Sequence, residues 1–192
     1  PYTMPSADQF KKWIENAQQQ EYTNENSSKQ VDPVFMKKLP KKGKILSKHA
    51  AANGYTEYVL SNGIKVSARQ SDIEPNRLTI NMFRLGGRSL YPDTDAPTMQ
   101  FLGNVVKESG AADFDFLTLE KKRRGKALRV VPYINDEEEG VKGVCVASDL
   151  KTWLQIMYLY LTNPRKDKDI FHNMIAKQQS MLRNRNASPN VT

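Results

Sequence analysis

The sequence predicts an α+β fold of two layers, in which an antiparallel sheet of about five strands has helices packed on one face. Three observations support this fold class. The dipeptide Asn62-Gly63 separates two short apolar runs, which is the strongest local signal for a β-hairpin. Arg77 to Leu85 alternates apolar and polar residues for most of its length. Apolar residues recur at helical spacing in three later segments, 96–109, 150–162 and 167–185.

The first 48 residues are expected to form an inter-domain helix and a linker, followed by a folded domain over residues 49–192. Ser6 to Gln20 is amphipathic, and Ser6 is a suitable N-cap. A lone helix of this length is marginal in water, so its apolar face needs a partner. Residues 21–30 are polar, and residues 31–48 contain two prolines and many lysines. We therefore expect a polar loop and then an extended linker.

The domain is expected to begin with a hairpin, Thr56 to Leu60 and Ile64 to Arg69, closed by a type I′ turn at Asn62-Gly63. Because side chains alternate along a strand, one face of this hairpin should point inward. The residues predicted on that face are Tyr58, Leu60, Ile64 and Val66.

A second pair of strands is predicted at Ala127 to Ile134 and Val141 to Ala147, on either side of the acidic turn Asn135 to Gly140. A calcium loop needs acidic or carbonyl ligands at alternate positions over a longer span. We therefore interpret the acidic turn as a solvated loop tip and not as a cation site.

The central helix is predicted between Asp95, a suitable N-cap, and Gly110, a residue type that often ends helices. Pro97 falls in the first turn, where proline is tolerated. Gly103 lies in the middle, where glycine costs about 1 kcal/mol relative to alanine. Either a small residue permits close packing at this position, or it is an incidental weak point.

Three more helices follow from start and stop signals. Leu119 to Lys126 has Thr118 as its expected N-cap, and Leu150 to Thr162 is capped by Ser148 or Asp149 and ended by Asn163-Pro164. The last helix runs from Asp167 or Lys168 to about Arg185. We interpret the apolar stripes of the last two helices as core and not as a cofactor site. Their members are Trp153, Leu154, Met157, Tyr160, Leu161, Ile170, Phe171, Met174, Ile175, Gln178, Met181 and Leu182.

The window Gln100-Phe101-Leu102-Gly103-Asn104 in the central helix has the outline of an inverted zinc-protease motif, His-x-x-Glu-His. That motif works because positions one and five of a helix share a face. Two imidazoles can then bind one zinc ion while the glutamate activates its water. Here the two ligand positions carry Gln100 and Asn104, and Gly103 replaces the glutamate. These three residues are the degenerate motif positions.

This window, with its surroundings, resembles the pitrilysin and insulin-degrading-enzyme type of zinc metallopeptidases. The resemblance covers about Gly54 to Arg185. It is carried by the order and spacing of several segments. These are Leu78 to Leu85, Gly86-Gly87, Asp93-Thr94-Asp95, the window itself, Leu60-Ser61-Asn62-Gly63-Ile64-Lys65-Val66 and Leu159-Tyr160-Leu161-Thr162-Asn163-Pro164. The resemblance implies a LuxS/MPP-like metallopeptidase fold, as in the mitochondrial processing peptidases.

The same resemblance implies that residues 49–192 are a non-catalytic peptidase-like domain from the second half of a longer bacterial enzyme, truncated before its last element. Such a domain helps to form the closed peptide-binding chamber opposite the catalytic half. Its partners would be the catalytic half, in the same chain or a sister subunit, and the peptide substrate. The alternative is a stand-alone inactive scaffold that assembles with a separate active peptidase subunit. An upstream His-x-x-Glu-His in the full gene would favour the first reading.

No catalytic residue and no metal ligand is predicted in this piece of chain. The amides of Gln100 and Asn104 are poor replacements for imidazole on zinc, and glycine cannot deprotonate water. The two histidines, His49 and His172, fall in the linker and on a late helix. We therefore expect no cofactor here and no activity of the fragment alone. The resemblance places zinc in the catalytic half of the parent protein.

The net charge of +8 raises the possibility of a nucleic-acid partner. The basic residues gather at 37–48, at 120–129 and near Arg183, without the interleaved aromatics that single-strand binding needs. We interpret them as a solvated basic surface and expect no nucleic acid. No run of eighteen apolar residues exists, so no membrane span is expected. Cys145 lies on an apolar strand and is interpreted as a buried hydrophobe. The compartment stays open between the periplasm and the cytoplasm of a bacterium.

Overall fold

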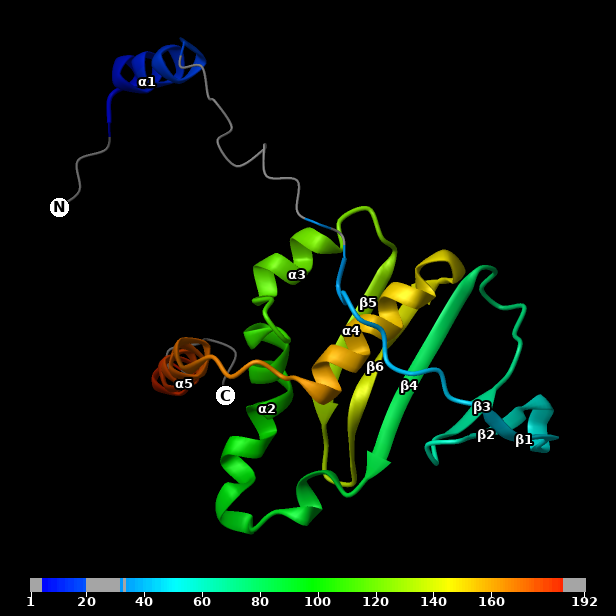
Figure 1. Ribbon diagram of the computed structural model, residues 1–192. Helices are drawn as coiled ribbons and strands as arrows, with labels where there is room; N and C mark the ends of the chain where they lie inside the picture. Colours follow the sequence, from blue (N-terminus) through cyan, green and yellow to red (C-terminus); the bar gives the residue numbers. More distant parts are fainter. Residues whose placement is uncertain (1–4, 20–31, 33, 185–192) are drawn as a thin grey trace. The chain divides into compact units, whose positions relative to one another are not determined.

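A computed structural model of the chain describes residues 5–19, 32 and 34–184 (Figure 1). The chain divides into two compact units, Pro1–Asp32 and Pro33–Thr192. The loop expected at 21–30 and the ending expected after residue 185 lie outside the described residues. The boundary between a helix-and-linker segment over 1–48 and a domain over 49–192 stays a prediction.

The first unit contains one described helix, α1 (Ala7–Gln19). Ser6 Oγ accepts from the backbone N–H of Gln9 at 3.3 Å, and Gln9 Oε1 accepts from the N–H of Ser6 at 2.9 Å. This reciprocal pair is a capping box and confirms Ser6 as the N-cap. The side chains of Phe10, Trp13 and Ile14 are about half exposed, and no residue of α1 is buried. The partner expected for this apolar face stays a prediction.

The second unit confirms the α+β class, with antiparallel strands and helices. The strand arrangement differs from the expected single sheet, because the described residues form six strands in two sheets of three. The hairpin sheet has the order β1-β2-β3, formed by Ile45–Ala50, Thr56–Leu60 and Lys65–Ala68. The central sheet has the order β4-β6-β5, formed by Arg77–Leu85, Glu138–Val146 and Leu128–Ile134.

Strand β1 is the element that the sequence pattern did not predict. Residues 31–48 were expected to be an extended linker, yet residues from Ile45 onward pair with β2. Phe35 is only 5% exposed and belongs to the core. A buried Phe35 and a strand from Ile45 onward were not expected of a linker, whereas residues 37–44 between them are exposed and lie outside the strands. A strand that is exposed along its whole length shows no alternation of apolar residues, which explains why the pattern missed it.

The loop between β2 and β3 corrects the predicted turn type. The N–H of Gly63 donates to Leu60 O and the N–H of Leu60 donates to Ile64 O, both at 2.9 Å. Of the pair Asn62-Gly63, only Gly63 has a positive φ, of 84°. This is a three-residue loop with a left-handed final residue and not a type I′ turn. Ile64 and Val66 are each 39% exposed, so their predicted inward orientation is also wrong.

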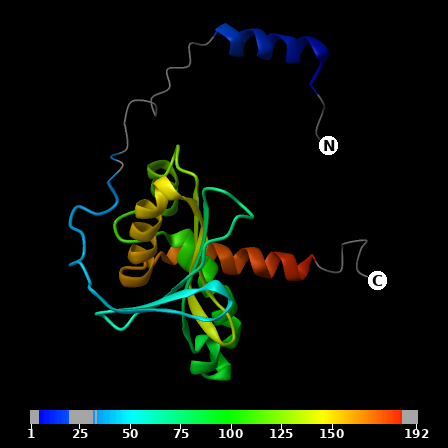
Figure 2. The same cartoon turned by 90° about the vertical axis from the view of Figure 1, so that its right-hand side faces the viewer.

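Four helices accompany the central sheet: α2 (Ala96–Ser109), α3 (Phe116–Lys122), α4 (Leu150–Thr162) and α5 (Lys168–Arg183). Helix α4 packs against β5 and β6, and α2 packs against β5. Figure 2 shows α4 on one side of the central sheet. The core lies between them around Trp153, which is 0% exposed and donates its indole N–H to Arg129 O at 2.8 Å. The other buried apolar residues are Phe35, Ala111, Leu119, Leu128, Val141, Cys145, Ile156, Leu159 and Tyr160.

The starts of the helices match the predictions unevenly. The bounds of α4 are as predicted, and Asp167 caps α5 by accepting from the N–H groups of Asp169 and Ile170. The predicted cap Thr118 is wrong. Helix α3 begins at Phe116, and Asp115 caps it by accepting from the N–H of Thr118 at 2.7 Å. Two possible caps three residues apart cannot be distinguished by composition alone.

The buried stripes also differ from those predicted. In α4 the buried apolar residues are Trp153, Ile156, Leu159 and Tyr160, whereas Leu154 and Leu161 are exposed. Because α4 is apolar on almost every side, its sequence is compatible with more than one buried face. No residue of α5 is buried, and Phe171, Met181 and Leu182 are exposed, so the core interpretation is wrong for α5. None of the described helices is long and apolar enough to cross a membrane.

Candidate functional site

The predicted strand β4 is confirmed over Arg77–Leu85, with Leu78, Ile80 and Met82 partly buried on one face. It leads into a short 3-10 helix, Gly87–Leu90, that packs against the turn between β5 and β6. Figure 1 shows the two turns at one end of the central sheet. Three backbone N–H groups, of Gly86, Arg88 and Ser89, donate to three carbonyl oxygens of the β5–β6 turn at 2.6–2.9 Å.

Gly87 permits this close approach of two backbones. Its φ is +54°, and a Cβ on it would lie 2.4 Å from the carbonyl oxygen of Asn135. Any larger residue would therefore push the two turns apart. The pairing fixes the position of the chain that leads into α2.

The acidic turn is shorter than predicted, because β6 already begins at Glu138. The side chains of Asn135, Asp136 and Glu137 are exposed, as a solvated loop tip requires. Their carbonyl oxygens accept from the N–H groups of Gly86, Arg88 and Ser89, and Asp136 Oδ1 accepts from Arg88 Nε at 2.9 Å. These oxygens are already engaged, which argues against a cation at this turn.

Helix α2 begins after a single turn at Asp93–Asp95. Pro97 lies in its first turn, as predicted, and Gly110 follows its last residue. Asp95 occupies the N-cap position, but its side chain accepts no capping hydrogen bond, so the capping role predicted for it is wrong. Its backbone is already helical, a conformation that points the side chain away from the capping geometry.

The degenerate motif positions lie on two sides of α2. Gln100 and Asn104 are exposed and one turn apart, so they share a face of the helix. Gly103 faces β5: a Cβ on it would lie 3.2 Å from Tyr133 Cα and 3.3 Å from Pro132 O. The small residue therefore allows α2 to approach the backbone of β5. This contact supports the close-packing interpretation of Gly103.

Tyr133 joins this contact to the start of β6. Its hydroxyl lies 2.9 Å from Glu138 Oε1 and 3.0 Å from Asn81 Oδ1. Burial raises the pKa of Tyr133, and the hydrogen bond to Glu138 raises it further. The phenol therefore stays protonated and donates across the sheet.

An open cleft of about 580 Å³ lies beside the exposed face of α2. It is bounded by the Gly87–Leu90 turn, the acidic turn and the first two turns of α2. The lining residues are Arg88, Ser89, Tyr91, Pro92, Asp93, Ala96, Met99, Gln100 and Asp136. The cleft thus offers carboxylates, an amide and an aromatic ring to a ligand, and one of the three motif positions, Gln100, lines it.

The donor groups of α2 do not fit zinc. Gln100 and Asn104 offer neutral amide oxygens, and the glycine between them offers no base. His49 lies on β1 with its Nε2 3.0 Å from Glu57 Oε2, and His172 lies on α5. Among the described residues no three His, Cys, Asp or Glu side chains come together. Cys145 is buried on β6, and burial raises the pKa of its thiol.

The sequence pattern predicted the helix that carries the motif but missed most of the cleft. Arg88, Tyr91 and Asp136 come from segments up to 48 residues apart that meet only because two turns pair. The one local signal was Gly86-Gly87 at the end of a strand, a pair that favours tight turns. This signal predicts a turn but does not indicate which other segment the turn contacts, so the cleft could not be predicted.

Comparisons with known proteins give a sequence relative and several solved structures, two of which are described below. No protein-family model matches the chain. The chain is 28% identical over 105 residues to the Probable zinc protease PqqL of Haemophilus influenzae. This match covers 55% of the chain and 11% of the relative.

The two solved structures share the fold of the chain. They are the periplasmic protease PqqL from Escherichia coli and a mutant of the ferredoxin protease FusC in complex with Arabidopsis ferredoxin. The TM-scores are 0.68 and 0.67, at 18% and 16% identity. The matches cover 81% and 98% of this chain but only 17% and 21% of those proteins. The chain therefore spans a small part of the length of each of these three proteins.

Proposed function

Because the chain resembles pitrilysin-type zinc metallopeptidases in sequence and fold over a small part of their length, we propose that it is a non-catalytic domain of such an enzyme. Its role is to form part of the wall of a closed peptide-binding chamber, opposite the catalytic half. The catalytic half lies in the same chain or in a sister subunit and holds the zinc ion. The peptide substrate is the second partner.

One observation carries this proposal. The window at 100–104 lies in the strand-turn-helix context of the zinc motif, but its exposed positions carry amides and its fourth position, Gly103, packs against β5. A domain of this kind keeps the shape of a peptidase domain without its chemistry. The exposed face of α2 and the cleft beside Gln100 are the surfaces that would contact a peptide.

The periplasmic location stated for PqqL of Escherichia coli supports a periplasmic parent protein over a cytoplasmic one. The complex of FusC with ferredoxin supports, in the same way, the proposal that the parent protein binds a polypeptide. Both statements concern those proteins, and their extension to this chain is part of the proposal.

The decisive experiment compares the chain with the full product of its reading frame. Both are purified, analysed for zinc, and assayed on a fluorescence-quenched unfolded peptide. We expect zinc and zinc-dependent cleavage for the full product, and neither for the chain alone. Deletion of residues 49–192 from the full product should abolish cleavage, and adding the chain in trans should restore part of it. Cleavage by the chain alone, or full activity without it, would overturn the proposal.

The alternative scaffold function gives a different result in the same experiment. In that case the reading frame encodes no upstream His-x-x-Glu-His, and the chain raises the activity of a separate peptidase that co-purifies with it.

A photo-crosslinking residue at Gln100, in the full product, tests whether this face forms part of the chamber wall. It should label the peptide, whereas the same residue at Lys151, on the exposed side of α4, should not.

A further inference from the structure

One basic surface of the chain is a continuous segment that we name the basic strap, residues 37–48. It contains six lysines: Lys37, Lys38, Lys41, Lys42, Lys44 and Lys48. No acidic residue occurs between residues 33 and 56. Every residue of the strap is exposed. The strap thus concentrates six positive charges with no local compensation.

The strap is held in place at both ends. Just before it, Phe35 is buried, and Lys122 Nζ lies 5.6 Å from the centre of its ring. At the other end the N–H of Lys44 donates to Ser61 Oγ at 2.9 Å, and Lys44 O accepts from the N–H of Ser61 at 2.8 Å. A segment fixed at both ends loses less conformational entropy when it binds a partner. The array of lysines is therefore partly preorganised.

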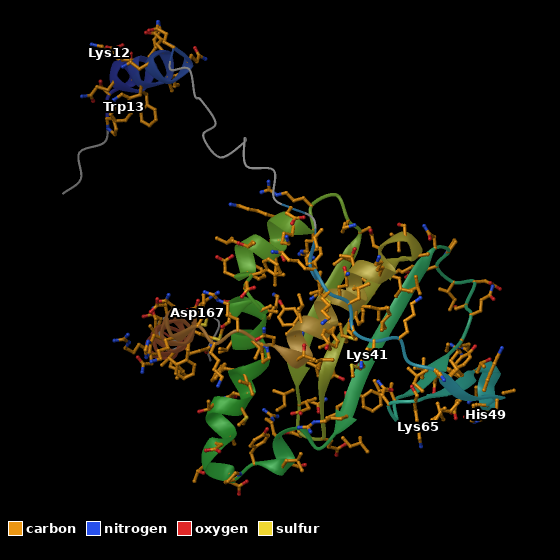
Figure 3. The ribbon with its side chains drawn as sticks, in the orientation of Figure 1. Lys12, Trp13, Lys41, His49, Lys65 and Asp167 are labelled. Atoms are coloured by element: carbon orange, nitrogen blue, oxygen red, sulfur yellow. The ribbon has the colours of Figure 1, made fainter. Side chains whose placement is uncertain are left out.

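No ion pair joins a lysine of the strap to a carboxylate among the described residues. The acidic residue nearest in the hairpin sheet, Glu57, pairs with His49. Lys48 lies over the ring of Tyr58, Lys65 adds charge on β3, and Arg69 follows the last residue of that strand. Figure 3 shows Lys41 on the strap, and His49 and Lys65 on the hairpin sheet beyond it. The positive surface therefore extends from the strap onto the sheet.

The strap ends in a free strand edge. Within residues 5–19, 32 and 34–184, β1 pairs on one side only, with β2. The N–H of Ala51 donates to Tyr55 O at 2.8 Å, in the same register as the pair His49 and Glu57. Because hydrogen-bonding residues alternate along an antiparallel pair, the N–H groups of Lys48 and Ala50 point away from β2. They donate to no residue in the described part of the chain.

We propose that the basic strap and the outer edge of β1 together form a docking site for an extended, acidic segment of a polypeptide. The lysines attract its carboxylates, and the outer N–H and C=O groups of Lys48 and Ala50 bond to its backbone. Exposed Leu39, Ile45 and Leu46 supply apolar contacts between the charges. This site is separate from the cleft beside α2, and the proposal does not depend on the peptidase function proposed above.

The observations favour a polypeptide over other polyanions. Only a polypeptide can pair with the outer edge of a strand. Nucleic-acid sites use arginine forks and free aromatic faces, whereas the strap has lysines only, and the nearby Tyr58 already lies under Lys48. A lipid surface would engage the charges but would leave the edge of β1 unpaired.

The test measures binding of the full chain to a fluorescein-labelled acidic peptide of about twelve residues, which matches the length of the strap. A peptide of the same sequence with Asp and Glu replaced by Asn and Gln is the neutral control. Anisotropy is recorded at about 50 mM and about 300 mM NaCl. We expect the acidic peptide to bind, with an affinity that falls with salt, and the neutral peptide not to bind.

The matched variants are the double substitutions Lys41→Glu/Lys42→Glu and Lys11→Glu/Lys12→Glu. Both reverse two adjacent exposed lysines, so they change the net charge equally. The strap variant should weaken binding about tenfold or more, and the α1 variant should change it less than about twofold. In parallel, amide hydrogen exchange at Lys48 and Ala50 should slow when the peptide is bound.

The outcomes separate clearly. If both double variants lose the same affinity for the acidic peptide, binding depends on net charge alone, and the proposed docking site is wrong. Unchanged exchange at Lys48 and Ala50 would overturn pairing along β1. Tighter binding of duplex DNA or of anionic vesicles than of the peptide would overturn the choice of a polypeptide. Failure of the peptidase proposal would leave all of these results unaffected.

Discussion

Gly103 determines what the window at 100–104 can hold. Its Cα faces the backbone of β5, and the two atoms nearest to an added Cβ, Tyr133 Cα and Pro132 O, belong to that backbone. Backbone atoms of a paired strand cannot move aside as the end of a side chain can. A glutamate at this position, as in the active motif, would have to displace either α2 or β5.

We therefore predict that Gly103→Glu lowers the free energy of unfolding by about 2–4 kcal/mol, from overpacking together with burial of a charge. The matched control is Asn104→Glu, which places the same side chain at the next, exposed position of α2 and should change stability by less than about 0.5 kcal/mol. Urea unfolding followed by circular dichroism measures both. Equal stability of the two variants would contradict the packing of Gly103 against β5.

Asp115 is a second residue whose role is local and measurable. Its side chain accepts from the N–H of Thr118, and this hydrogen bond is the largest cause that lowers the pKa of Asp115 below its ordinary 3.8. We predict that Asp115→Ala lowers the free energy of unfolding by about 1 kcal/mol near pH 7. The control is Asp113→Ala, an equal change of charge at an exposed position two residues earlier.

The effect of Asp115 should depend on pH in a fixed direction. Because the folded-state pKa is depressed, the cap stabilises the fold above the unfolded-state pKa. That stabilisation is lost as the pH falls through the folded-state value, below 3.8. The stability difference between wild type and Asp115→Ala should therefore shrink in acid, as measured by urea midpoints from pH 7 to pH 3. A difference that stays constant would show that the carboxylate does not act as the cap.

At the scale of elements, the Gly87–Leu90 turn and the β5–β6 turn act as one unit. Gly87 and Gly125 both have positive φ, at +54° and +76°, so alanine is strained at either position. They differ in space: nothing lies within 4 Å of a Cβ at Gly125, whereas a Cβ at Gly87 meets Asn135 O at 2.4 Å. The comparison of the two substitutions isolates the contact between the turns.

We predict that Gly125→Ala costs about 1 kcal/mol, the cost of the backbone conformation alone. Gly87→Ala should cost about 1–3 kcal/mol more, because the two turns must separate. Thermal unfolding gives both values, and hydrogen exchange of the Arg88 and Ser89 amides should accelerate only in Gly87→Ala. If the two variants lose the same stability, the turns do not depend on each other.

Elements governed by local rules were predicted closely, and elements governed by contacts were not. β4 and α4 match their predicted bounds because alternation and a proline stop are local signals. The type of the loop after β2 was predicted wrongly, because Asn62-Gly63 is compatible with two loop geometries. The buried face of α4 was misplaced because the position of the central sheet, and not the helix itself, selects which residues are buried.

At the scale of the whole molecule, the division into two sheets could not be predicted, since β1 has no apolar alternation. The candidate site was predicted only in part. The face shared by Gln100 and Asn104 follows from helical spacing, so it could be derived from the sequence. The cleft depends on two turns that meet at one end of the central sheet, and its shape follows from tertiary contacts alone.

The two compact units lead to the last prediction, which concerns their independence. Among the residues that the structure describes, the buried apolar ones all lie in the unit Pro33–Thr192, and α1 has none. A chain of residues 33–192 should therefore unfold cooperatively, with a free energy of unfolding within about 1 kcal/mol of the full chain. A chain of residues 37–192 removes only four more residues but also removes Phe35, which is 5% exposed in the core. Loss of a buried phenylalanine side chain costs about 3–5 kcal/mol.

The two truncated chains are compared by urea unfolding with Phe35→Ala in the full chain. The shorter truncated chain and the Phe35→Ala variant should lose similar stability, because both lack the phenyl ring that packs beside Lys122. If removal of residues 1–32 alone is as costly as removal of residues 1–36, then α1 contributes to the stability of the domain. In that case the boundary at residue 33 would not separate independent units. If neither truncation lowers the free energy of unfolding, the burial of Phe35 does not hold the basic strap in place. The preorganisation of the strap must then come from β1 alone.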